Sequence, residues 1–266
     1  MRANTIKQRL ANGDAVINAW LSIGSSYSAE GMAHAGFHSA TVDLQHGMFG
    51  FETALQMLQA ISTSPAIPLV RVPGLEPTQI MQVLDAGAYG VICPMISTAP
   101  EAEKLVSACK YPPVGTRSFG PSRGLLYGGP DYVAKANETI MAIPMIETED
   151  AVTNIDAILA VDGVDMIYIG PNDLAFNLEG SVGFPRTKSE SAISHILKQA
   201  QAQSVPVGIF CADAEEARRR LDAGFAMVTP ANDFGHLIRS GTAAVARLLE
   251  KKESPGSPMA TVKAGY

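Results

Sequence analysis

The sequence is poor in the features that mark several large classes of protein. It has no excess of basic charge, because 20 lysines and arginines stand against 26 aspartates and glutamates, whereas proteins that bind nucleic acid through phosphates normally carry one. No apolar run approaches the roughly 18 residues that a membrane span needs. Aromatic residues make up only 6% of the 266 residues, but 47% are hydrophobic, which excludes low-complexity disorder. We therefore expect a globular chain that binds neither nucleic acid nor a membrane.

Cysteine is also scarce. The three cysteines, Cys93, Cys109 and Cys211, form neither a C-x-x-C pair nor a disulfide framework. The first ten residues carry positive charge without the apolar stretch of a secretion signal. Both observations predict a cytoplasmic protein with reduced thiols.

Short apolar runs alternate with longer segments of helical character, which is typical of a parallel sheet with helices on its faces. The predicted strands are residues 15–23, 40–44, 67–72, 90–95, 140–146, 165–169, 206–211 and 226–229. About eight strands in about 250 residues match an α/β fold of the (β/α)8 TIM-barrel type. We predict a single catalytic barrel domain over 1–250 and a flexible tail over 251–266, where the composition turns to Lys, Ser, Pro and Gly.

Three helix-to-strand junctions are written almost identically, as Ala-Gly pairs that end at Gly36, Gly87 and Gly224. Each glycine is expected to end its helix in the left-handed conformation. One connection is much longer than the rest: residues 96–139 hold a helix near 98–110 and then a Gly/Pro-rich stretch. We favour a loop on the catalytic rim that covers a site; an insertion that makes a subunit contact is the alternative.

Few polar residues end the predicted strands, where a barrel places its reactive groups. Glu147 and Asp173 end two successive strands, so their carboxylates can converge. Oxygen ligands without Cys or His favour a hard divalent ion, Mg²⁺ or Mn²⁺, with Co²⁺ as a third candidate. The alternative is that each carboxylate caps the helix that follows it.

Two further strand ends carry polar groups. Arg71 lies in an apolar strand, so its guanidinium needs an anionic partner, either a bound oxyanion, which we favour, or a structural carboxylate. His46 follows Asp43 by three residues, and that carboxylate could orient the imidazole for acid/base work; a packing histidine is the alternative. Gly170, Pro171, Asn172 and Asp173 open a helix whose free amides could hold a small carboxylate.

Other chemistries lack support. No lysine ends a predicted strand, which disfavours a Schiff-base aldolase. The nucleotide-binding and serine-hydrolase motifs are absent.

These residues resemble the metal-dependent pyruvate aldolases of the HpcH/HpaI type, which include 4-hydroxy-2-oxoheptanedioate, 2-dehydro-3-deoxyglucarate and 2-keto-3-deoxy-L-rhamnonate aldolases. The likeness covers roughly residues 5–250. It rests on Val42-Asp43-Leu44-Gln45-His46, Leu69-Val70-Arg71-Val72-Pro73, Tyr111-Pro112-Pro113-Val114-Gly115-Thr116-Arg117, Ile146-Glu147-Thr148 and Ile169-Gly170-Pro171-Asn172-Asp173-Leu174.

The resemblance implies a TIM barrel that exchanges its last helix with a neighbour and assembles as a homo-hexamer. It also implies that Glu147 and Asp173 hold the divalent ion, that Arg71 contacts the keto oxygen, and that Asp43 and His46 form the acid/base pair. Two positions depart from the family's pattern: Gln45 stands where glutamate is usual, and Met145 where glutamine is common.

We therefore predict a lyase that reversibly cleaves a 4-hydroxy-2-oxo acid into pyruvate and an aldehyde. The same enolate chemistry would serve an oxaloacetate decarboxylase or a CoA-ester lyase. A barrel that binds oxo acids without turning them over is a third alternative.

Overall fold

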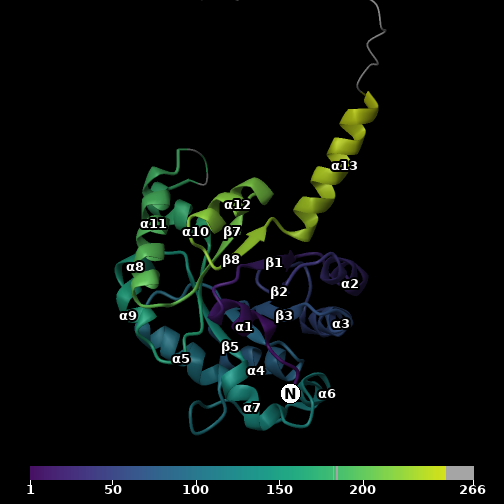
Figure 1. Ribbon diagram of the computed structural model, residues 1–266, viewed down its shortest axis with the longest axis vertical. Coiled ribbons are helices and arrows are strands. Elements are labelled where there is room, and N and C mark those ends of the chain that lie inside the picture. Colours follow the sequence, from purple (N-terminus) through teal and green to yellow (C-terminus); the bar gives the residue numbers. More distant parts are fainter. Residues whose placement is uncertain (182, 184, 250–266) are drawn as a thin grey trace, which may run out of the picture.

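The computed structural model describes residues 1–181, 183 and 185–249, and in them the chain forms a closed barrel of eight parallel strands in chain order (Figure 1). This confirms the predicted fold. The predicted tail, 251–266, lies outside the described residues. The strands are β1 (Val16–Leu21), β2 (Ser39–Asp43), β3 (Ile67–Arg71), β4 (Gly90–Cys93), β5 (Met141–Ile146), β6 (Ile167–Ile169), β7 (Val207–Cys211) and β8 (Met227–Pro230).

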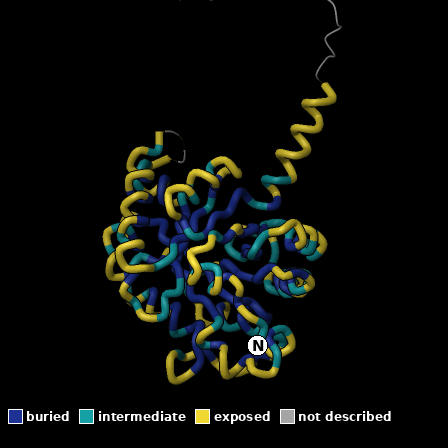
Figure 2. Tube along the Cα trace, in the orientation of Figure 1, coloured by how far each residue is buried: buried dark blue, intermediate teal, exposed yellow. Residues whose placement is uncertain are grey.

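Helices alternate with the strands, and most of them cover the outside of the barrel. They are α1 (Thr5–Ala11), α2 (Ser26–His34), α3 (Phe51–Ile61), α4 (Pro77–Asp85), α5 (Ala99–Cys109), α6 (Ser122–Gly128), α7 (Tyr132–Thr139), α8 (Glu149–Thr153), α9 (Ile155–Leu159), α10 (Pro171–Glu179), α11 (Thr187–Ala202), α12 (Ala214–Asp222) and α13 (Asp233–Leu249). Because helices shield the outer face and side chains fill the interior, the strands are buried almost throughout (Figure 2). Their apolar runs are therefore continuous rather than alternating.

The barrel interior contains a closed polar network. Asn18 on β1 donates to Thr229 on β8 at 2.9 Å and accepts from the hydroxyls of Ser39 and Thr41 on β2. Tyr168 on β6 donates to the same Thr229 at 2.6 Å. These buried groups satisfy one another, which avoids the penalty for burying an unpaired polar atom. The network ties β1, β2, β6 and β8 together below the site.

The three repeated glycine junctions have the predicted backbone. Gly36, Gly87 and Gly224 have φ angles of 98°, 103° and 101°, a region that costs other residues roughly 1–2 kcal/mol. Each lets the chain leave its helix and turn into the next strand.

The long connection does not lie on the catalytic rim, so our favoured prediction for residues 96–139 is wrong. Helix α5 follows β4 directly and carries the chain to the opposite, N-terminal end of the barrel, where the rest of the connection stays. Arg117 there binds Asp85, the last residue of α4, at 2.6 Å. The amide of Arg2, ahead of β1, donates to the carbonyl of Gly128. The segment therefore closes the bottom of the barrel.

The last described helix, α13, projects away from the barrel (Figure 1). It leaves apolar side chains exposed to solvent along its length: Phe234, Leu237, Ile238, Val245, Leu248 and Leu249. So many exposed apolar side chains on one helix are uncommon on the surface of a protein. Among the described residues, no helix is both long enough and apolar enough to span a bilayer.

Candidate active site

A cavity of about 520 Å³ opens at the carboxyl ends of the strands, the end at which barrel enzymes carry their sites. The predicted residues Asp43, His46, Arg71 and Asp173 line it. Glu147 is 1% exposed and lies beneath the wall. The structure therefore brings together side chains from four different strand ends.

Asp43 and Arg71 form a buried bidentate ion pair. The two residues are register partners on β2 and β3. Arg71 donates from Nε to Asp43 Oδ1 at 2.8 Å and from a terminal nitrogen to Oδ2 at 2.6 Å. The anionic partner of Arg71 is thus a structural carboxylate, the alternative that we did not favour. Among the described residues, the other terminal nitrogen, Nη1, has one hydrogen-bond partner, the weakly accepting sulfur of Met145 at 4.0 Å, so it can still donate to a ligand in the cavity.

The Asp43 carboxylate does not orient the His46 imidazole, which corrects the prediction from their spacing. Asp43 Oδ1 accepts from the backbone amides of Gln45 and His46 at 3.1 and 3.2 Å, and Oδ2 accepts from the indole of Trp20 at 3.0 Å. Burial disfavours the carboxylate's charge, but these donors and Arg71 outweigh it and hold the pKa of Asp43 below its usual value. The His46 side chain is exposed at the cavity and forms no hydrogen bond in the described structure.

Glu147 directly follows β5. One of its carboxylate oxygens accepts a hydrogen bond and the other has no partner among the described residues. Oε1 accepts from the amide of Met95 at 2.9 Å, and the left-handed backbone of Met95, with φ 58°, delivers that amide. Oε2 is buried without a hydrogen-bond partner. Burial and the nearby Asp173 charge raise the pKa of Glu147 to about 7. A buried carboxylate left half unpaired suits a cation.

Neither carboxylate caps a helix through its side chain, so the alternative for Glu147 and Asp173 is not supported. Thr148 caps α8, accepting from the amide of Ala151. Asp173 lies inside the first turn of α10, and its carboxylate forms no hydrogen bond with any described residue. In the described part of the chain no three His, Cys, Asp or Glu side chains cluster as a metal site. Glu147 and Asp173 are therefore the two carboxylates that could bind a cation at this site, and both offer the hard oxygen ligands that Mg²⁺ prefers.

Gly170 allows Glu147 to occupy its place. A Cβ at Gly170 would lie 2.2 Å from Glu147 Oε2, so any side chain there would displace the carboxylate. After Gly170, Pro171 opens α10, and the amides of Asn172 and Asp173 fall in the first turn, where a helix has no internal acceptors for them. This turn can therefore hold an anion beside the carboxylates.

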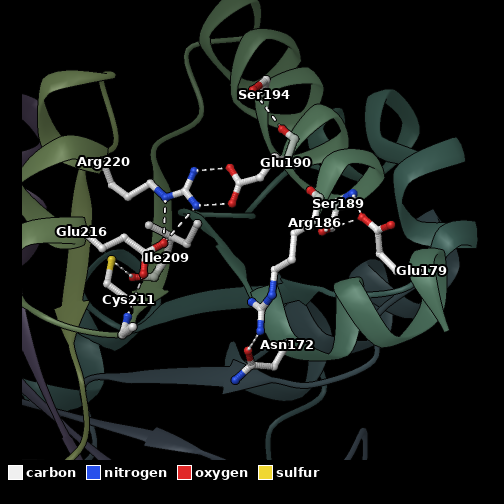
Figure 3. A network of polar contacts seen from close by, with 11 residues as sticks. Asn172, Glu179, Arg186, Ser189, Glu190, Ser194, Ile209, Cys211, Glu216 and Arg220 are labelled. Carbon is white, nitrogen blue, oxygen red and sulfur yellow. Dashed lines mark hydrogen bonds and ion pairs between the residues drawn. The ribbon is translucent and has the colours of Figure 1, made fainter. Parts of the chain in front are cut away.

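A second cavity of about 670 Å³ adjoins the first and shares Pro171, Asn172 and Phe210 with it. Its walls are held by charged contacts (Figure 3). Arg220 on α12 binds Glu190 on α11 at 2.7 Å and Glu216 on its own helix at 3.0 Å. Asn172 accepts from Arg186 at 3.0 Å. These contacts tie α10, α11 and α12 into one side of the site.

Sequence reasoning missed two parts of the site. Trp20 on β1 contacts both members of the ion pair, with the Arg71 guanidinium 4.8 Å from its ring centre. Its signal was present, since a buried indole N–H needs an acceptor. Asp233, at the start of α13, accepts from Ser22 and Ile23 and fixes the cavity wall after β1. Because this contact joins residues that lie far apart in the sequence, no local sequence pattern marks it.

Comparisons with known proteins agree with this geometry. The family model described as HpcH/HpaI aldolase/citrate lyase matches residues 17–240. A hydroxypyruvate/pyruvate aldolase of Rhizorhabdus wittichii is 40% identical over 245 residues, which cover 91% of this chain and 98% of the relative. A 4-hydroxy-2-oxo-heptane-1,7-dioate aldolase of Salmonella newport is 38% identical, with 96% and 98% covered.

A solved structure is similar over nearly the same span. The crystal structure of an HpcH/HpaI aldolase/citrate lyase family protein from Burkholderia cenocepacia superposes with a TM-score of 0.87 at 32% identity, over 92% of this chain and 99% of that one. Sequence and fold both cover the barrel and every strand end that carries the site. The chain belongs to the HpcH/HpaI aldolase/citrate lyase family.

Proposed function

We propose that the protein is a metal-dependent class II pyruvate aldolase, a lyase that reversibly cleaves a 4-hydroxy-2-oxo acid into pyruvate and an aldehyde. The observation that carries this proposal is Glu147 Oε2, which is buried without a hydrogen-bond partner among the described residues. Its carboxylate interacts electrostatically with Asp173 and Arg71, two residues that line the cavity. The names of the two aldolase relatives support the proposal.

The residues present fit a divalent ion. Glu147 and Asp173 would hold Mg²⁺ or Mn²⁺, with Co²⁺ as a further candidate, because both donors are hard carboxylate oxygens. When bound, the ion would act as a Lewis acid toward the carboxylate and keto oxygens of the oxo acid.

The chain's own groups supply the remaining chemistry. Arg71, held by Asp43, lines the cavity and would stabilise the enolate oxygen of pyruvate through Nη1. The first-turn amides near Gly170, Pro171, Asn172 and Asp173 would hold the carboxylate. His46 would accept the proton of the C4 hydroxyl during cleavage and return it during condensation.

The direct test is cleavage of 4-hydroxy-2-oxoheptanedioate, with pyruvate and aldehyde both quantified. We expect activity with Mg²⁺ that EDTA abolishes and that Glu147→Ala lacks. Activity that survives both treatments would refute the metal mechanism. Release of CO₂ from oxaloacetate without any aldehyde cleavage would favour a decarboxylase, and a CoA requirement a CoA-ester lyase. Metal-dependent binding of pyruvate without turnover would favour a non-catalytic barrel.

We also propose that the protein assembles as a homo-oligomer through α13, as a hexamer by family resemblance. Because α13 projects outward, the outer face of β1 and β8 keeps an open groove of about 420 Å³ between α2 and α12. Phe37, Leu221 and Val228 line that groove, and an apolar helix of a second copy would fill it. The apolar side chains along α13 support this exchange.

We also propose that the enzyme is cytoplasmic. All three cysteines are free and buried, so the fold does not depend on a disulfide.

A further inference from the structure

The tryptophan on β1 is bound to both halves of the Asp43–Arg71 pair. Trp20 is 3% exposed and donates its indole N–H to Asp43 Oδ2 at 3.0 Å, the same oxygen that accepts from Arg71. The guanidinium carbon of Arg71 lies 4.8 Å from the centre of the indole ring, within the range of a cation–π contact. The indole of Trp20 thus contacts the Asp43 carboxylate through its edge and the Arg71 guanidinium through its face.

The indole itself is fixed by the barrel interior. Tyr168 lies 5.5 Å from it in a tilted arrangement, and Phe210 lies 5.7 Å away edge to face. Tyr168 is held in turn by its hydrogen bond to Thr229. Side chains from β6 and β7, and through Thr229 from β8, therefore fix the position of Trp20.

These contacts fix the orientation of the Arg71 guanidinium. Asp43 accepts from Nε and from one N–H of Nη2, and the indole covers one face. Nη1 contacts the Met145 sulfur, a weak acceptor, so its N–H groups and the second N–H of Nη2 can donate to a ligand. We propose that Trp20 is a positioning residue that aims Nη1 of Arg71 at the reacting oxygen, and that Asp43 serves as the fixed anchor of this unit. This inference rests on the proposed function, since it specifies how Arg71 meets the enolate.

The test separates the indole N–H from the space that the ring fills. Trp20→Phe keeps an aromatic ring and removes the donor to Asp43. Tyr132→Phe is the matched control: it also removes a buried polar group from an aromatic ring beside an arginine, but the lost hydrogen bond is to Arg117 at the opposite end of the barrel. For each variant we would measure the rate at which the methyl protons of pyruvate exchange in D₂O with saturating Mg²⁺, with thermal unfolding as the check on folding.

A double-mutant cycle with Arg71→Lys distinguishes positioning from general packing. Lysine keeps the charge but cannot form the bidentate fork. If Trp20 acts through Arg71, Trp20→Phe should slow exchange on the order of 10-fold in the wild-type background, as expected for a lost hydrogen bond to a charged group. In the Arg71→Lys background it should have little further effect. Equal losses in both backgrounds, or an equal loss in Tyr132→Phe, would overturn the inference.

A second readout does not depend on activity. Trp20 is the one tryptophan in the sequence, so intrinsic fluorescence reports its surroundings directly. We expect Asp43→Asn and Arg71→Lys to change its emission maximum, and Asp222→Asn, in an exposed ion pair, to leave it unchanged. Unchanged emission in all three variants would overturn the contact. A wild-type protein that exchanges no protons but shows the emission changes would refute the proposed function alone.

Discussion

Replacing Gly170 by alanine should disable the site through a single methyl group. The new Cβ would lie 2.2 Å from Glu147 Oε2 and 2.8 Å from the Met145 methyl carbon, whereas ordinary contacts begin near 3.4 Å. The carboxylate would therefore have to retreat by about 1 Å, a displacement that can reduce catalysis roughly 100-fold. Overpacking of this kind also destabilises a fold by about 1–3 kcal/mol.

The assay pairs activity with metal binding. Cleavage of the oxo acid and Mg²⁺ affinity by calorimetry would be measured on Gly170→Ala and on Gly31→Ala. Gly31 lies inside α2, and a Cβ there meets nothing within 4 Å, so alanine should stabilise the helix by up to about 1 kcal/mol. Full activity and unchanged Mg²⁺ affinity in Gly170→Ala would refute the reasoning, since they would mean that Glu147 does not need its observed place.

Three further predictions concern charge and assembly. Because burial raises the pKa of Glu147 from 4.5 to about 7, the metal-free folded protein keeps a proton on Glu147 over a pH range in which the unfolded chain has lost it. The free energy of unfolding should therefore fall by at most about 3 kcal/mol between pH 4.5 and 7. Thermal unfolding measured against pH should show this fall in EDTA and not in Mg²⁺. Asp43→Asn should cost about 3–5 kcal/mol in urea unfolding because it leaves a buried cation unpaired, whereas Asp222→Asn, in an exposed pair, should change stability little; equal effects would contradict this. Leu237→Asp on the apolar side of α13 should reduce the oligomer seen by light scattering to monomers, and Ser240→Asp should not; an unchanged mass for Leu237→Asp would exclude α13 from the interface.

Much of the barrel was predictable because its signals are local. Apolar runs predicted all eight strands, and every predicted strand end lies within two residues of the observed one. Gly36, Gly87 and Gly224 marked the ends of helices because each adopts a positive φ, which favours glycine. The long connection could also have been placed correctly. A helix that follows a strand directly returns the chain to the opposite end of a barrel, so the part of the connection between α5 and β5 was to be expected away from the catalytic rim.

The site was predicted as a set of residues but not as a set of contacts. Spacing along the chain linked Asp43 to His46, three residues away. Pairing across strands instead placed Asp43 opposite Arg71, and a bidentate guanidinium is a stronger partner for a buried carboxylate than an exposed imidazole. Trp20 was missed because its contacts cross from β1 to β2 and β3, so no spacing along the chain marks them.

The central claim is that Glu147 and the residues around it activate pyruvate. Exchange of the pyruvate methyl protons in D₂O, followed by proton NMR, tests that claim without assuming any aldehyde. The account predicts exchange that requires Mg²⁺, stops with EDTA and falls to background in Glu147→Gln. Exchange that continues at the wild-type rate in EDTA and in Glu147→Gln would contradict it.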